Sequence, residues 1–303
     1  MRLTVIIPAY NAAAFVGRAL ASLPEGLVQT VVVDDGSRDG TADEVCRVQP
    51  SALLLTQENA GVSAARNTGI VASDGDYLVF LDADDRLAPG ALESLSAYLD
   101  TAHPDIVIMR SFSAGVERYP WGGLFQEGAF LTKEAVIRQG YVRGSVCGCA
   151  FRKAYLTANA LTFTEGIAMG EDLIFLSSAL SAGGSVVFKD IPFYEVLERG
   201  ESASRYHDEA FLRRYGDGLV AASEKISDPA LRTLACLSYI LGITRVGNEL
   251  GYGPRRTKEM GRIGEVLPLS TEGLMTDRAA VHLLNLSYPA IYFAKILHDR
   301  LKR

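Results

Sequence analysis

Three carboxylates lie within four positions of the chain, directly after an apolar run. Residues 77–81 are apolar without a break, and Asp82, Asp84 and Asp85 follow them. Carboxylates this close repel one another unless a cation or a solvated turn takes up their charge. The cluster therefore predicts one of two structures, a site for a hard divalent cation or an Asp-rich turn that caps the next helix. The sequence around it decides between them.

The apolar runs of the first hundred residues predict strands that alternate with helices. The predicted strands comprise residues 3–7, 31–33, 52–55 and 77–81. We expect Pro8 to end the first strand and Asn11 to cap the helix that follows it. Further helices are expected from Thr41 and over residues 62–71. This alternation indicates an α/β fold with a doubly wound, mostly parallel sheet.

Polar segments follow three of the predicted strands, at residues 8–11, 34–37 and 82–85. Doubly wound sheets bind ligands outside the carboxyl ends of their strands, so the three segments are expected to share one crevice. The sequence lacks the glycine patterns of a dinucleotide fold and of a P-loop. An aromatic ring, hydrogen-bond acceptors and carboxylates are suited to a nucleotide diphosphate held with Mg²⁺ or Mn²⁺.

Arg66 lies in the first half of the predicted helix over residues 62–71. Its guanidinium group is suited to pair with a phosphate through two hydrogen bonds. A solvated helix residue with a surface partner fits the same position equally well. Both interpretations stay open on the sequence alone.

Four segments in order resemble the signatures of the family 2 glycosyltransferases with the GT-A fold. They are VIIPAYN at 5–11, VDDGS at 33–37, NAGVSAARN at 59–67 and FLDADD at 80–85. With a later segment, the resemblance covers about the first two thirds of the chain. It implies an inverting transferase that uses a nucleotide-diphosphate sugar, most often a UDP-sugar, together with Mn²⁺ or Mg²⁺.

The resemblance also implies roles for individual residues. Tyr10 and Asp35 would contact the base, and Asp34 beside them is expected to be structural. Asp84 would bind the metal that bridges the diphosphate. Beside it, Asp85 is expected either to shape the turn or to position the residues that bind. The residues expected to bind the donor nucleotide are Pro8, Tyr10, Asp35, Arg66, Asp82, Ala83 and Arg199, and those expected at the metal are Asp84, Asp82 and His207.

A second acidic segment, MGEDLIF at 169–175, resembles the part of the family that opens a helix on the acceptor side. The resemblance implies that Asp172 is the catalytic base and that Glu171 orients the base or the acceptor. An inverting transfer needs such a carboxylate, because the attacking hydroxyl must lose its proton. The alternative is that both residues are first-turn acids favoured by the helix dipole.

The segments between and after these motifs carry weaker signals. Tyr119 and Trp121 could stack on a sugar, although an aromatic packing anchor is the more ordinary interpretation. Cys147 and Cys149 form a C-x-C pair, which we interpret as two half-buried strand residues on one face rather than a metal site. The polar loop over 198–205 resembles a segment that closes over the donor diphosphate, and Arg199, Arg205 or the nearby His207 could supply a phosphate or metal contact.

Composition bounds the class of protein. The chain has 303 residues, 48% of them hydrophobic, and a net charge of −6, which gives no general attraction to nucleic acid. The four cysteines have neither the density of a disulfide framework nor the paired spacing of a zinc site, which favours a reducing compartment. No apolar run is long enough for a signal peptide or a membrane span, so we expect a cytoplasmic protein. We expect a nucleotide-sugar-binding half (1–104), an acceptor-binding and catalytic-base half (105–208) and a helical C-terminal region (209–303).

The last residues of the chain, 288–303, combine apolar, aromatic and basic side chains. That composition suits a helix lying on the inner face of the cell membrane, where a lipid-linked acceptor would be found. A helix that packs on its own domain or on a second subunit fits equally well. The sequence does not indicate an oligomeric state.

Two classes of function follow from these observations. The first is a metal-dependent inverting glycosyltransferase that moves a sugar to a hydroxyl of a glycan or a lipid-linked acceptor, as in the synthesis of a bacterial-type surface polysaccharide. The second is a catalytically silent nucleotide-sugar-binding or scaffold protein of the same fold. The paired acids of both motifs favour the first, because a silent protein has no physical reason to retain them. A nucleotidyltransferase is disfavoured by the absence of a Gly-rich basic loop after the first strand.

Overall fold

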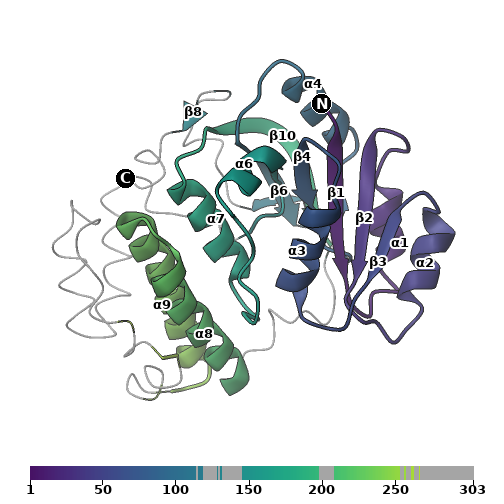
Figure 1. The fold of residues 1–303 in the computed structure, drawn as a ribbon. Coiled ribbons are helices and arrows are strands. Elements are labelled where there is room, and N and C mark those ends of the chain that lie inside the picture. The colour runs from purple at the N-terminus through teal and green to yellow at the C-terminus, as the bar shows by residue number, and fades with distance from the viewer. Residues whose placement is uncertain are drawn as a thin grey trace.

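The computed structural model describes residues 1–113, 115–118, 128, 130–131, 145–197, 208–252, 256, 261–262 and 266. Within them, helices pack on both faces of a mixed sheet, and two further helices lie beside one end of it (Figure 1). The strands are β1 Leu3–Ala9, β2 Val28–Asp34, β3 Leu53–Thr56, β4 Tyr77–Phe80, β5 Arg86–Leu87, β6 Ile106–Ser113, β7 Val116–Arg118, β8 Phe130–Leu131, β9 Cys149–Arg152 and β10 Val186–Val196. The helices are α1 Val16–Ala21, α2 Thr41–Val48, α3 Val62–Ala72, α4 Ala91–Leu99, α6 Lys153–Ala158, α7 Glu171–Ser181, α8 Glu209–Lys225 and α9 Pro229–Glu249.

The sheet has the strand order β3-β2-β1-β4-β9-β6-β10-β5, with β7 beside β6 and β8 beside β10. Strands β3, β2, β1 and β4 are parallel, as are β6 and β10. Strand β9 enters between β4 and β6 and is antiparallel to both, so the sheet is mixed. Two antiparallel steps leave β6 and β10 pointing the same way as β4. The carboxyl ends of β1, β2, β4 and β10 therefore lie at one edge.

Alternating side chains of the central strands fill two hydrophobic layers. In β4, Leu78 and Phe80 face the layer under α3, α6 and α7, whereas Tyr77 and Val79 face the layer under α1 and α4. Burial on both faces explains the unbroken apolar composition of this strand. The first layer continues into α8 and α9, so the three predicted regions share one core. The boundaries after residues 104 and 208 stay predictions.

Four phenylalanines join helix α7 to the sheet. The Phe175 ring stacks on Phe163 with 4.0 Å between centroids, and it meets Phe151 edge to face at 5.4 Å. Phe80 of β4 contacts the edge of Phe163 at 5.1 Å. All four rings are buried. This packing fixes α7 relative to β4 and β9. It also fixes the position of Asp172, which lies about one helical turn before Phe175.

Two expectations about the first strand and helix were wrong. Pro8 lies inside β1, opposite Val33, rather than ending the strand. The Ile6 carbonyl accepts from the Leu81 N–H, so the backbone of Ile6 faces β4. Residues two apart along a strand face the same neighbour, so the Pro8 nitrogen also faces the β4 side. Because β4 has already ended at Phe80, no ladder hydrogen bond is lost there. Asn11 does not cap a helix, because α1 begins only at Val16 and has no side-chain cap.

Two later expectations also differ from the structure. Apolar runs predict two strands, at residues 186–189 and 193–197, but residues 186–196 form the single strand β10, whose register with β6 shifts on both sides of Pro192. Cys147 and Cys149 are fully buried rather than half-buried, and they lie in opposite hydrophobic layers because Cys147 belongs to a turn before β9. Neither is in a disulfide.

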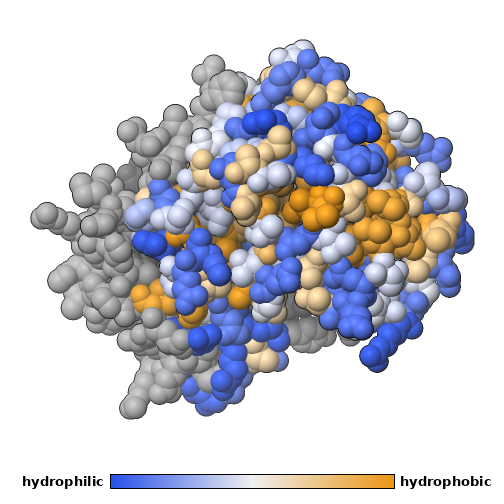
Figure 2. Space-filling view, viewed as in Figure 1, coloured by the Kyte–Doolittle hydropathy of each residue, from blue (hydrophilic) through white to orange (hydrophobic). Residues whose placement is uncertain are grey.

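The surface view shows apolar areas over the region of α3 and β3 (Figure 2). Val71 of α3 and Leu53 of β3 are exposed apolar residues of these elements. Scattered apolar side chains are ordinary on folded proteins.

Among the described residues, no helix combines the length and the apolarity that a membrane crossing requires. The segment 288–303, with its predicted membrane contact, lies outside the described residues, as do Tyr119 and Trp121.

We expect Phe175→Ala to lower the free energy of unfolding by about 3–5 kcal/mol, because the substitution leaves a cavity among three other rings. Urea unfolding followed by circular dichroism measures this change. The matched control is Val71→Ala, which truncates a side chain that is 82% exposed and should change the stability by less than about 0.5 kcal/mol. Equal effects of the two substitutions would contradict the packing described here.

Candidate active site

The polar segments predicted to meet in one crevice do lie at one edge of the sheet. Ala9 of β1 pairs with Asp34 of β2, and the Asp35 N–H donates to the Ala9 carbonyl at 2.8 Å. The turn after β4 begins at Leu81, whose N–H donates to Ile6. Helix α7 runs back along the sheet before β10, so its first turn lies at the same edge. The fold therefore brings the acids after β4 and those of α7 together at one edge of the sheet.

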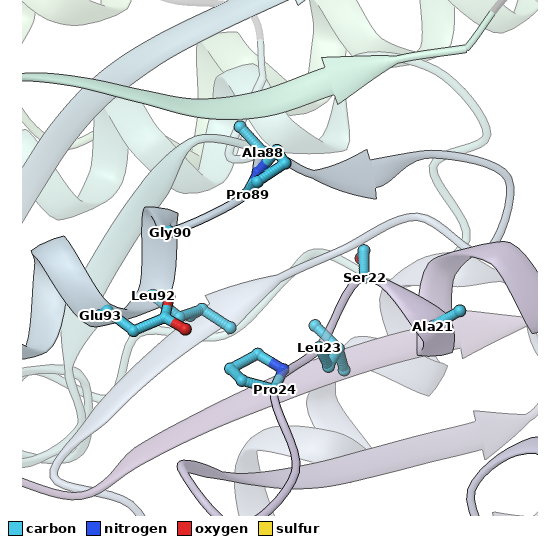
Figure 3. Close-up of a pocket in the computed structure, with 9 residues that line it drawn as sticks. All are labelled: Ala21, Ser22, Leu23, Pro24, Ala88, Pro89, Gly90, Leu92 and Glu93. Carbon is cyan, nitrogen blue, oxygen red and sulfur yellow. The ribbon is translucent and has the colours of Figure 1, made fainter.

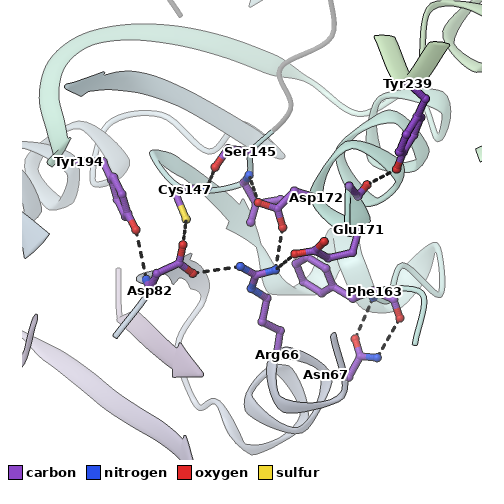
Figure 4. Close-up of polar contacts among 12 residues, drawn as sticks. Arg66, Asn67, Asp82, Ser145, Cys147, Phe163, Glu171, Asp172, Tyr194 and Tyr239 are labelled. Atoms are coloured by element: carbon purple, nitrogen blue, oxygen red, sulfur yellow. Dashed lines mark hydrogen bonds and ion pairs between the residues drawn. The ribbon is translucent and has the colours of Figure 1, made fainter. Parts of the chain in front are cut away.

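Arg66 of α3 lies at the centre of these acids (Figure 4). Its Nη1 donates to Asp172 Oδ1 at 2.7 Å and to Glu171 Oε1 at 3.0 Å, and its Nη2 donates to Asp82 Oδ1 at 3.0 Å. The side chain is only 3% exposed, so the interpretation of Arg66 as a solvated helix residue is wrong. Its role as a phosphate contact stays a prediction, and the guanidinium group already donates to three carboxylates.

The charge of Arg66 is held firmly in place. Burial lowers the pKa of its guanidinium, but the charges of Asp172, Asp82 and Glu171 together raise it well above its ordinary value. The guanidinium also lies 5.1 Å from the centre of the Phe163 ring. Its buried Nε has no hydrogen-bond partner among the described residues. Such an unsatisfied group costs stability, which is typical of side chains held for function.

Asp172 is the most perturbed carboxylate in this cluster. Burial raises the pKa of its carboxyl to about 7, and the negative charges of Glu171 and Asp82 act in the same direction. Arg66 and the Val146 N–H, which donates to Oδ2 at 3.1 Å, oppose this shift. One guanidinium faces three carboxylates, so the cluster has an excess of negative charge. A proton on Asp172 or a cation near Asp82 would reduce that excess.

Asp82 and Asp85 of the same turn have different surroundings. The Asp82 side chain is 37% exposed, and its Oδ2 lies 3.6 Å from the Cys147 thiol. Asp85 is buried and accepts from the Tyr194 hydroxyl at 2.8 Å and from the Leu197 N–H at 2.9 Å. Its carboxylate therefore joins the turn to the end of β10. This arrangement agrees with the expected structural role of Asp85.

The two carboxylates at the end of β2 are both buried. Asp34 accepts from the Ser37 N–H and shapes its own turn, as expected. Asp35 Oδ1 accepts from the Gln57 side chain and the Ala60 N–H, and Oδ2 accepts from the Gly61 N–H. Asp35 therefore positions the segment that leads into α3. A contact between Asp35 and a base stays a prediction.

Asn11 links the loop after β1 to the loop after β2. Its N–H donates to Ser37 Oγ and its Oδ1 accepts from the Arg38 N–H, both at 2.9 Å. Its φ of 48° is left-handed, a conformation that asparagine adopts more readily than most residues. Tyr10 beside it is 51% exposed. The exposed ring lies at the edge where a base is expected to bind.

The remaining predicted contacts divide into described and undescribed residues. Pro8 and Ala83 are buried, and Asp84 is partly exposed in the turn after β4. Arg199 and His207 lie outside the described residues. The structure thus brings together Arg66, Asp82, Glu171 and Asp172, and it places Asp84 two residues from that cluster.

The acids of the cluster differ from a metal site built by protein ligands alone. No group of three or more His, Cys, Asp or Glu residues in the described part of the chain could hold a metal ion. Mg²⁺ and Mn²⁺ are commonly held by one or two carboxylates together with substrate phosphates. Asp84, with Asp82 beside it, fits that kind of site. The residues present do not fit a closed site made by protein ligands alone.

Three neighbours of the cluster were missed on the sequence. The Val146 N–H fixes Asp172, and the Asp82 N–H donates to the Tyr194 hydroxyl at 3.2 Å. Asn67 next to Arg66 accepts from the Phe163 N–H and donates to the Phe163 carbonyl, which holds that ring beneath the guanidinium. The run Arg66-Asn67 in the third motif was the available signal. The partners themselves are far away in the sequence.

A cavity of about 220 Å³ lies elsewhere, between the end of α1 and the start of α4 (Figure 3). Leu23, Pro24 and Pro89 are among its lining residues. None of the lining residues is a predicted site residue. We assign it no ligand.

Comparisons with known proteins identify the family and several relatives of the chain. The family model for Glycosyl transferase family 2 matches residues 4–158. The succinoglycan biosynthesis protein ExoO of Rhizobium meliloti (strain 1021) is 33% identical over 250 residues, which cover 71% of this chain and 70% of ExoO. The poly(ribitol-phosphate) beta-N-acetylglucosaminyltransferase TarS of Staphylococcus aureus (strain Mu50 / ATCC 700699) is 26% identical over 215 residues, covering 67% of this chain and 37% of TarS.

Two solved structures share the fold. Residues 1–349 of S. aureus TarS, in complex with UDP-GlcNAc, superpose with a TM-score of 0.63 at 22% identity, covering 79% of this chain and 72% of that one. The mannosyltransferase PcManGT from Pyrobaculum calidifontis, in complex with GDP-Man and Mn²⁺, superposes with a TM-score of 0.54 at 20% identity, covering 90% and 82%. At these identities the likeness shows the shared α/β fold.

The ionisation of Asp172 predicts a pH-dependent stability. Its folded pKa of about 7 lies above the ordinary 3.8, so the native state holds the proton more tightly than the unfolded chain. The resulting stability is present below about pH 4 and is lost as the pH rises through about 7. Relative to Asp172→Asn, which cannot ionise, the wild type should lose about 2–4 kcal/mol between about pH 4 and pH 8. Urea unfolding across that range measures the difference, and a difference independent of pH contradicts the assignment.

Proposed function

The chain belongs to glycosyl transferase family 2 and is a glycosyltransferase, and from this premise we propose that it transfers a sugar from a nucleotide-diphosphate donor with inversion. A UDP-sugar is the proposed donor, supported by the UDP-GlcNAc complex of TarS. The proposed acceptor is a hydroxyl of a glycan or a lipid-linked glycan. The observation that carries the proposal is the Arg66 bridge between the acid after β4 and the acids of α7.

Asp172 is the proposed general base. Each of its carboxylate oxygens accepts one hydrogen bond, from Arg66 and from the Val146 N–H, and each retains a lone pair. Its pKa of about 7 is close to the pH at which the protein is expected to work, which suits proton transfer. The acceptor hydroxyl attacks the anomeric carbon in line with the leaving diphosphate and passes its proton to Asp172.

The acids after β4 are proposed to serve the donor. Asp84, with Asp82 beside it, would hold a divalent cation against the diphosphate, and Tyr10 and Asp35 would lie at the base. The Mn²⁺ in the PcManGT structure supports the use of such an ion. When bound, the cation neutralises charge on the leaving diphosphate. Arg66, which donates to both Asp82 and Asp172, links the proposed metal side of the site to the base.

Glu171 is proposed to orient the reacting groups rather than to take the proton. Its side chain is 14% exposed and shares Nη1 of Arg66 with Asp172. Sharing one donor holds the two acids on the same side of the guanidinium. The negative charge of Glu171 also favours the protonated form of Asp172. After each transfer, Asp172 must therefore release the accepted proton to solvent before it can act as a base again.

We expect Asp172→Asn to reduce kcat by about 10²-fold or more, because the amide cannot accept the proton. Release of UDP from UDP-N-acetylglucosamine and other UDP-sugars with Mn²⁺ measures turnover.

Asp84→Asn should instead abolish the thermal stabilisation that UDP and Mn²⁺ give the wild type, because that substitution removes the proposed metal ligand.

Asp43→Asn is the matched control, since Asp43 is also an acid in the first turn of a helix, α2. It should leave both turnover and thermal stabilisation unchanged. If Asp172→Asn turns over as the wild type does, Asp172 is not the base. If the wild type is stabilised by UDP-sugars and Mn²⁺ but transfers none of them, a silent nucleotide-sugar-binding protein replaces the enzyme in this proposal.

A further inference from the structure

Helix α9 reaches the segment that carries the proposed base. The hydroxyl of Tyr239, in the middle of α9, donates to the Gly170 carbonyl at 2.6 Å (Figure 4). Gly170 directly precedes Glu171 and Asp172. Tyr239 is only 2% exposed, and burial raises the pKa of its hydroxyl well above the ordinary value, so the hydroxyl stays a donor.

The Gly170 carbonyl is also the start of α7. It accepts from the Ile174 N–H at 3.2 Å, which closes the first turn of the helix. A carbonyl oxygen has two lone pairs, and here one is used by the helix and the other by Tyr239. The φ of Gly170 is 81°, in the left-handed region that favours glycine. The turn before the acids is thus held by a backbone bond and by a side chain from another part of the chain.

The contact between Tyr239 and this turn is close on all sides. A Cβ placed on Gly170 would lie 2.2 Å from the Tyr239 hydroxyl oxygen. A Cβ placed on Gly218 of α8 would lie 2.5 Å from the Tyr239 ring and 2.6 Å from the Met169 carbonyl. All three distances are shorter than van der Waals contact. Glycines at these positions let α8, α9 and the start of α7 meet directly.

We propose that Tyr239 is a positioning residue for the transfer reaction, which fixes the Gly170 carbonyl and thereby the first turn of α7, where Glu171 and Asp172 face Arg66. The inference rests on the proposed function, because it takes Asp172 to be the base. Tyr239 acts through the backbone and contacts neither substrate. The helical pair α8 and α9 then contributes to the geometry of the reaction as well as to the core.

A second tyrosine, Tyr155 of α6, also contacts α7 and offers a matched comparison. The Tyr155 hydroxyl donates to the Ala179 carbonyl at 2.6 Å and accepts from the Gly184 N–H at 3.0 Å. Tyr155 is also buried. It therefore holds the last turns of α7, whereas Tyr239 holds the first. Removing each hydroxyl separates the effect of a lost buried hydrogen bond from the effect of its place on the helix.

The experiment compares Tyr239→Phe, Tyr155→Phe and Asp172→Asn in the full chain. Release of UDP from UDP-N-acetylglucosamine with Mn²⁺ gives kcat and the donor KM. Tyr239→Phe should lower kcat by about 10-fold or more and leave the donor KM within about 2-fold, because a small displacement of a catalytic group slows the chemical step without touching the donor. Tyr155→Phe should leave kcat within about 2-fold. Equal kcat values for the two tyrosine variants overturn the inference.

Hydrogen–deuterium exchange supplies a readout that does not depend on the donor. In Tyr239→Phe, the Ile174 amide, which donates to the Gly170 carbonyl, should exchange about 10-fold faster or more, while amides at the end of α7 stay protected; Tyr155→Phe should show the reverse. Unchanged exchange at the first turn in Tyr239→Phe overturns the inference. An active Asp172→Asn variant instead overturns the proposed base, even where the exchange result holds.

Discussion

One guanidinium group donates hydrogen bonds to three carboxylates that come from separate parts of the chain. Arg66 and Asp82 belong to the first hundred residues, whereas Glu171 and Asp172 lie 105 and 106 positions after Arg66. The cluster is largely buried, and removing one member of a buried charge cluster leaves its partners uncompensated. The positions of α3, the turn after β4 and the start of α7 therefore depend on one another. The rest of the fold holds these three elements where Arg66 can reach all of the acids.

The core and the charge cluster support each other. Phe175 and Phe163 pack α7 against β4 and β9, and Asn67 holds Phe163 beneath the guanidinium. Asp85 joins the turn after β4 to the end of β10. Tyr239 adds a fixed point at the start of α7. A carboxylate with a pKa near neutrality costs stability when ionised, and this rigid packing is what allows the fold to retain it.

The sequence predicted the elements better than their contacts. The unbroken apolar run of β4 and the three acids after it placed the turn at a strand end, and the GED segment placed two acids on a helix start. Local patterns could not give the partners of Arg66, because a helix position says nothing about which distant acids face it. Both sequence interpretations of Arg66 involved an exposed or ligand-facing group, and neither included a buried one with three protein partners.

Other differences have similar causes. Pro8 stays inside β1 because the neighbouring strand ends first, and a single strand's sequence does not contain that information. Cys147 and Cys149 lie in opposite layers because the strand begins only at Cys149. Tyr194 and Tyr239 gave no signal at all, since a buried tyrosine hydroxyl has no local pattern. The sequence predicted which acids belong to the candidate site, but it did not predict the side chains that hold those acids in place.

The most direct test of this account is a double-mutant cycle between Arg66→Gln and Asp172→Asn, measured by urea unfolding at about pH 8. Arg66→Gln alone leaves a buried carboxylate unpaired, so the double variant should lose less stability than the sum of the single variants, by about 2 kcal/mol or more. If the losses add within about 0.5 kcal/mol, the two side chains are not coupled. The central role assigned to Arg66 would then be wrong.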